Sequence, residues 1–81
     1  MVESNHMPTA TNKLPDLKTE FADPAEKGAH VNEIVNIASK AVSDGDKNWQ
    51  QFTYKEAHVE YIVALDGFMH LMKLTKDDAN F

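Results

Sequence analysis

The sequence predicts an all-α protein, an antiparallel helical hairpin preceded by an extended N-terminal arm. Two segments with apolar residues at helical spacing support this fold, and each opens with a helix-start signal. Strand-like alternation of apolar and polar residues is not convincing anywhere. We expect residues 1–22 to form an extended or disordered arm and residues 23–81 to form the helical hairpin domain.

The arm has few apolar side chains, and Pro8 and Pro15 disfavour regular structure within it. Its second half nevertheless carries three apolar residues at helical spacing. They predict a short anchor that docks on a partner or on the hairpin itself, and the alternative is a disordered tail with incidental apolar residues. The three anchor residues are Leu14, Leu17 and Phe21.

The first helix is expected to start at Asp23, which can cap it. Pro24 suits the first helical position, and Glu26 stands where a capping box places a carboxylate. Gly45, directly after Asp44, is expected to end the helix in a left-handed conformation. The apolar stripe between these signals consists of Val31, Ile34, Val35, Ala38, Ala41 and Val42.

The second helix is expected from Tyr54 to about Leu74, after another capping box formed by Thr53 and Glu56. Apolar residues cover about half of its circumference, which is more than one partner helix can bury. We therefore expect a homodimer, or docking on a larger protein, to complete the fold. Besides the arm anchor, the expected partner-binding residues are Trp49, Val59, Tyr61, Ile62, Leu65, Phe68, Met69 and Met72.

The segment between the two expected helices partly follows the pattern of an EF-hand calcium loop. Asp44, Asp46 and Asn48 place oxygen ligands at its first, third and fifth positions, and Glu56 stands near its end. However, the spacing to Glu56 is one residue too long, and Trp49 occupies the position of the turn-forming glycine. These four oxygen-bearing residues are weak metal candidates, and an ordinary helix–helix turn is the alternative.

The four histidines form no recognisable metal or catalytic constellation in the sequence. His70 follows Asp66 by four residues, which supplies two ligands where zinc needs three or four. We expect this pair, and Glu60, on solvated faces of the second helix. His30 borders the apolar stripe of the first helix, and His58 falls inside the apolar arc of the second; each can be a buried, hydrogen-bonded side chain or a pH-sensitive interface residue. No cofactor or catalytic residue is expected.

Composition narrows the class of function. The chain has 81 residues, a net charge of −5 and no cysteine, and its eight cationic residues are all lysine. An acidic chain without arginine is poorly suited to direct nucleic-acid binding, and a glycine-rich phosphate loop is missing. No apolar run approaches the roughly 20 residues of a membrane span. We expect a cytoplasmic protein that neither enters a membrane nor catalyses a reaction.

The sequence therefore predicts a small acidic protein–protein interaction module, either an accessory subunit or a homo-oligomeric helical bundle. One alternative is an acidic inhibitor that occupies a basic site on another protein, such as a nucleic-acid enzyme. A second alternative is a degenerate calcium-binding helix–loop–helix.

Overall fold

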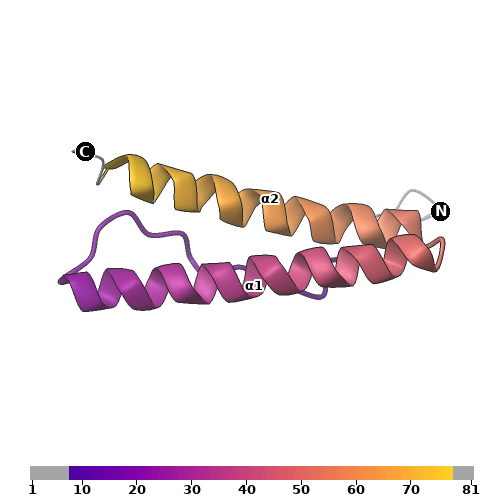
Figure 1. Ribbon diagram of the computed structural model, residues 1–81, viewed down its shortest axis with the longest axis horizontal. Helices are drawn as coiled ribbons and strands as arrows, with labels where there is room; N and C mark the ends of the chain where they lie inside the picture. The colour runs from indigo at the N-terminus through magenta and orange to yellow at the C-terminus, as the bar shows by residue number, and fades with distance from the viewer. Residues whose placement is uncertain (1–7, 78–81) are drawn as a thin grey trace, which may run out of the picture.

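Two antiparallel helices dominate the computed structural model, which describes residues 8–77 (Figure 1). Helix α1 comprises Pro24–Gln50 and helix α2 comprises Tyr54–Asp77, with a short turn at residues 51–53. No strand occurs within residues 8–77, so the predicted all-α hairpin is confirmed. Residues 1–7 of the expected arm and 78–81 of the expected hairpin domain lie outside the described residues. Neither helix combines the length and hydropathy that a membrane span requires.

The start of α1 agrees with the prediction. Asp23 Oδ1 accepts a hydrogen bond of 2.8 Å from Glu26 N, and Pro24 occupies the first turn. Glu26 Oε1 in turn accepts from Ala22 N at 2.5 Å. The bond from Glu26 N satisfies a backbone donor that the first helical turn leaves unpaired, and the bond from Ala22 N ties the residue before the cap to the helix. The hydrogen bond from Ala22 N and the nearby Lys18 lower the pKa of Glu26.

The predicted end of α1 at Gly45 is wrong, because the helix continues to Gln50. Gly45 is buried, its φ is not positive, and the ring of Tyr61 lies directly over it. A Cβ atom at this position would lie 2.6 Å from Tyr61 Cε1. Gly45 therefore makes room for an aromatic ring from α2, and this packing favours continuation of the helix.

The turn between the helices contains Phe52, whose φ of 65° lies in the left-handed region. Thr53 N and Thr53 Oγ1 each donate to Asn48 O at 2.9 Å. The predicted capping box with Glu56 is therefore wrong, because these groups of Thr53 bind the end of α1. Helix α2 nevertheless begins at Tyr54, as predicted.

Small side chains make the contact between the helices. Gly67 is buried against α1, where a Cβ atom would lie 3.2 Å from Ala38 Cβ. Glycine and alanine at such positions let two helix backbones approach closely. Four of the six buried apolar residues are alanines; the six are Ile34, Ala38, Ala41, Ala57, Ala64 and Leu74.

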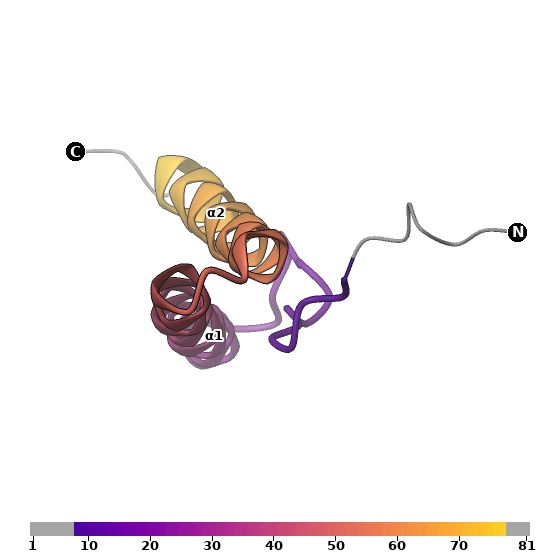
Figure 2. The same ribbon diagram turned by 90° about the vertical axis from the view of Figure 1, so that its right-hand side faces the viewer.

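The arm runs along one side of the helix pair, and the view in Figure 2 shows the opposite side without it. Residues 8–22 contain no helix or strand. Leu14 and Phe21 are half-buried, whereas Leu17 is exposed. Leu14 reaches Gly67, with its Cδ2 atom 3.4 Å from the position that a Cβ of Gly67 would take. The described part of the arm therefore docks on the hairpin itself, which is one of the outcomes expected for the anchor.

Candidate interaction surfaces

The side of the hairpin that faces away from the arm is apolar. On α2, Glu60 and Gly67 contact the arm, and the next residues, Tyr61 and Phe68, lie about 100° further round the helix. Tyr61 packs over Gly45 of α1 on that side. We call this surface the apolar face and define it by helical spacing as Val31, Val35, Val42 and Trp49 of α1 with Tyr54, Tyr61, Leu65, Phe68 and Met72 of α2.

The apolar face carries large side chains that the hairpin leaves uncovered. Leu65 is 56%, Phe68 41% and Met72 65% exposed. Ile62 and Met69, on the adjoining outer surface of α2, are also exposed. Among the other expected partner-binding residues of this helix, Val59 and Tyr61 are half-buried. His58 is exposed.

Three aromatic residues gather at the turn end of the apolar face. The ring centroids of Trp49 and Tyr54 lie 4.6 Å apart, and those of Phe52 and Tyr54 lie 6.2 Å apart. All three rings are exposed. Tyr54 contacts both other rings, and through it Phe52, in the turn between the helices, joins the apolar face.

The interpretation of residues 44–56 as a calcium loop is wrong, because Asp44, Asp46 and Asn48 lie within α1. Their side chains make other contacts: Asp46 Oδ1 accepts from Tyr61 Oη at 2.6 Å, and Asn48 Nδ2 donates to Asp44 O at 3.0 Å. Glu56 lies in the first turn of α2. Across residues 8–77, no group of three or more histidine, cysteine, aspartate or glutamate side chains is arranged to hold a metal ion.

On the opposite side, Glu60 fixes the first part of the arm. It was expected on a solvated face, but it is 2% exposed. Its carboxylate accepts from Thr11 N at 2.8 Å, Thr11 Oγ1 at 2.6 Å, Asn12 N at 3.4 Å and Asn12 Nδ2 at 2.9 Å. Burial raises the pKa of Glu60, but these hydrogen bonds outweigh burial and bring the pKa below its ordinary value.

Asn12 joins the arm to both helices. Its Nδ2 atom donates to Glu60 Oε1 of α2 and to Asp44 Oδ2 of α1, each at 2.9 Å. Asp44 Oδ2 also accepts from Lys40 Nζ at 3.1 Å. The bonds from Asn12 and Lys40 lower the pKa of Asp44. The two acceptors stand 48 and 32 residues from Asn12, so local sequence spacing gives no signal for this site.

A histidine pair holds the second part of the arm. His70 was expected on a solvated face with Asp66, but it is buried, whereas Asp66 is exposed. Its Nε2 atom lies 3.4 Å from His30 Nε2, and His30 is buried too. The buried, hydrogen-bonded alternative is thus confirmed for His30. His30 Nε2 also accepts from Lys18 N at 3.3 Å, and its ring centroid lies 5.2 Å from that of Phe21.

The arm covers one side of the helix pair and leaves the other side bare (Figure 2), and the exposed residues of the apolar face lie on the bare side. All buried side-chain nitrogen and oxygen atoms of the described residues have hydrogen-bond partners. Comparison with protein-family models, curated proteins and solved structures gave no match.

Proposed function

We propose that the protein is an interaction module that binds a second copy of itself through the apolar face, giving a four-helix arrangement. The observation that carries this proposal is the exposure of Leu65, Phe68 and Met72 on successive turns of α2. Large exposed apolar patches mark interaction sites more often than they mark free surface.

The composition of the core supports the need for a partner. Alanines bury little apolar area, and they make up four of the six buried apolar residues. Small domains with a limited core commonly depend on association for stability. Covering the apolar face would add several large side chains to the buried interior of each copy.

A second copy fits this face in length and charge. The face extends over 19 residues of α2, from Tyr54 to Met72, or about 27 Å of helix, and another copy offers the same length. Asp46, at its edge, accepts a hydrogen bond from the Tyr61 hydroxyl. Between chains that each carry −5, an uncharged contact avoids placing like charges together. A two-fold symmetry axis would place the apolar face of one copy against the apolar face of the other.

Sedimentation of the full chain and two matched leucine variants tests this proposal. Leu65→Lys places a charge on the apolar face, whereas Leu17→Lys makes the same change at an exposed leucine of the arm. We expect the wild type and L17K to form dimers at micromolar concentration. L65K should associate at least about tenfold more weakly, a loss of about 1.4 kcal/mol.

A compact wild-type monomer across this concentration range would contradict the proposal, as would equal dimerisation of L65K and L17K. Circular dichroism serves as a folding control. Loss of helix in L65K but not in L17K would also support association, because a lysine at an exposed position of a stable monomer has little effect on folding.

A further inference from the structure

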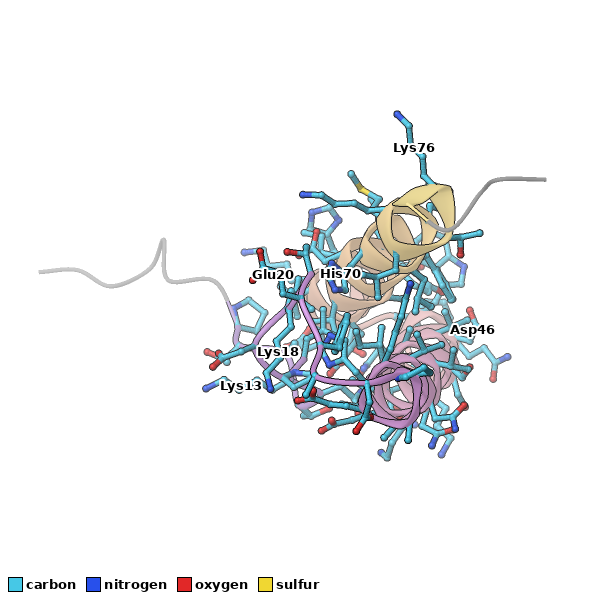
Figure 3. All side chains as sticks on the ribbon, turned by 90° about the vertical axis from the view of Figure 1, so that its left-hand side faces the viewer. Lys13, Lys18, Glu20, Asp46, His70 and Lys76 are labelled. Carbon is cyan, nitrogen blue, oxygen red and sulfur yellow. The ribbon has the colours of Figure 1, made fainter. Side chains whose placement is uncertain are left out.

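The histidine pair stands apart from the apolar face and connects three parts of the molecule. His30 comes from α1, His70 from α2, and Lys18 N reaches His30 from the arm. Figure 3 looks along the helix pair from this end, with Lys18, Glu20 and His70 labelled. Both rings are buried, so a change in their charge acts directly on the contacts around them.

The hydrogen bonds determine where the protons lie. Lys18 N–H can only donate, so His30 Nε2 is an acceptor and carries no proton. His30 is then neutral, with its proton on Nδ1. The proton of the 3.4 Å contact between the two Nε2 atoms then comes from His70, so the single lone pair of His30 Nε2 is shared between two long contacts, from Lys18 N and from His70 Nε2.

Protonation of His30 removes the acceptor on which this arrangement depends. With a proton on His30 Nε2, the donors Lys18 N–H, His30 Nε2–H and His70 Nε2–H would meet without an acceptor between them. Protonation of His70 as well would add repulsion between two buried positive charges. The His30 ring would then no longer be held in position against the ring of Phe21.

The surrounding charges do not supply a ready acceptor. Glu26 is close enough to His30 for a favourable charge interaction, but no hydrogen bond joins these two side chains: Glu26 accepts from Ala22 N, and its Oε2 atom lies 3.6 Å from Lys18 Nζ. Charged residues of both signs flank the pair within about one helical turn or in the adjoining arm: Lys18 and Glu20, then Glu26, Lys27 and Glu33 on α1, and Asp66 and Lys73 on α2.

The first part of the arm depends on a different kind of acceptor. Thr11 and Asn12 bind the carboxylate of Glu60, which remains an acceptor in the pH range where histidines gain protons. The two attachments therefore respond to acid in different pH ranges.

From this geometry we propose that the His30–His70 pair is a pH-sensitive latch, which holds the arm around Lys18 and Phe21 at neutral pH and releases it when the histidines become charged. Thr11 and Asn12 stay bound to Glu60, and Ala22 N stays bound to Glu26, so only the segment between these two attachments loosens.

Backbone amide relaxation by NMR can follow both attachments in the full chain. Between about pH 7.5 and about pH 5, the order parameter of the Lys18 amide should fall from about 0.85 to below about 0.6. The Thr11 amide should keep its value. Unchanged Lys18 order, or a parallel loss at Thr11, would overturn the proposal.

A matched pair of histidine variants assigns the effect. His30→Gln retains a side-chain acceptor for Lys18 N but does not titrate, so the transition at Lys18 should disappear. His58→Gln changes an exposed histidine and should leave the transition unchanged. A transition that persists in H30Q would overturn the latch.

Because His30 is buried, H30Q must be checked for helix content, and a wild-type measurement provides an independent test. The ring resonance of His30 should titrate with the same midpoint as the loss of Lys18 order. Midpoints that differ by more than about one pH unit would overturn the proposal.

Discussion

Thr11 Oγ1 lies 2.6 Å from Glu60 Oε2, so an exposed residue of the arm covers a carboxylate that α2 buries almost completely. With the other donors from Thr11 and Asn12, this contact replaces the water that an isolated carboxylate would need. The arm and Glu60 therefore depend on each other: the arm gains its strongest attachment, and the carboxylate gains its solvation.

Replacing Glu60 with glutamine should release the first part of the arm. The amide offers one acceptor oxygen, and its NH₂ group would face donors from Thr11 and Asn12. We expect E60Q to lower the free energy of unfolding by about 1–3 kcal/mol, measured by urea denaturation. Glu56→Gln, one turn earlier and exposed, should change it by less than about 0.5 kcal/mol. Equal losses in both variants would contradict the role of Glu60.

Glu60 should also make folding sensitive to acid. Its pKa in the folded protein lies below the ordinary value of 4.5, so its contribution to stability is fully present above about pH 4.5. The contribution is lost as the pH falls through the lowered pKa. The urea midpoint of the wild type should therefore drop between about pH 5 and about pH 3, and that of E60Q should drop less. Parallel pH profiles would exclude Glu60 as a source of this dependence.

Two glycines of α1 should respond in opposite ways to alanine. Nothing lies within 4 Å of a Cβ at Gly28, so G28A should stabilise the protein by up to about 1 kcal/mol through helix propensity. G45A places its methyl 2.6 Å from the Tyr61 ring and should destabilise by about 1–3 kcal/mol. Thermal unfolding of the two variants compares them directly. Stabilisation by G45A would contradict this expectation, because it would show that the Tyr61 ring can move away without a loss of stability.

At position 52, glycine should give a more stable fold than phenylalanine. Its φ of 65° is unfavourable for a bulky side chain, and its ring is 75% exposed. We expect Phe52→Gly to stabilise the fold by about 1 kcal/mol, because glycine adopts this conformation without a steric penalty. Gln51→Gly, at the neighbouring residue with φ −94°, lacks this benefit and should not stabilise. A loss of stability in F52G would indicate that the contact with Tyr54 outweighs the strain.

Local signals predicted the parts of the fold that depend on neighbouring residues. Asp23 and Pro24 mark the start of α1, and α2 begins at Tyr54 as expected. The signal at Gly45 failed because its physical cause is distant in the chain. The ring of Tyr61, 16 residues later, turns an apparent stop into a packing position.

The helix contact itself was hard to predict because its residues are small. The largest apolar residues of α2, such as Leu65 and Phe68, suggest a stripe that differs from the one in contact with α1. Ala57, Ala64 and Gly67 mark the true contact, but they contribute little to a hydrophobic pattern. When these small residues are taken as the contact of α2 with α1, helical spacing puts Glu60 and His70 next to that contact, on the side that the arm covers.

The position of the arm on one side of the helix pair has a practical consequence. Lys13 is exposed and lies on the side of the helix pair that the arm occupies (Figure 3). A fluorescent or affinity label attached to a cysteine introduced at Lys13 should therefore leave assembly undisturbed. In a two-fold dimer joined through the apolar face, two such labels would point outward from opposite sides, and their separation would report directly on how the copies are arranged.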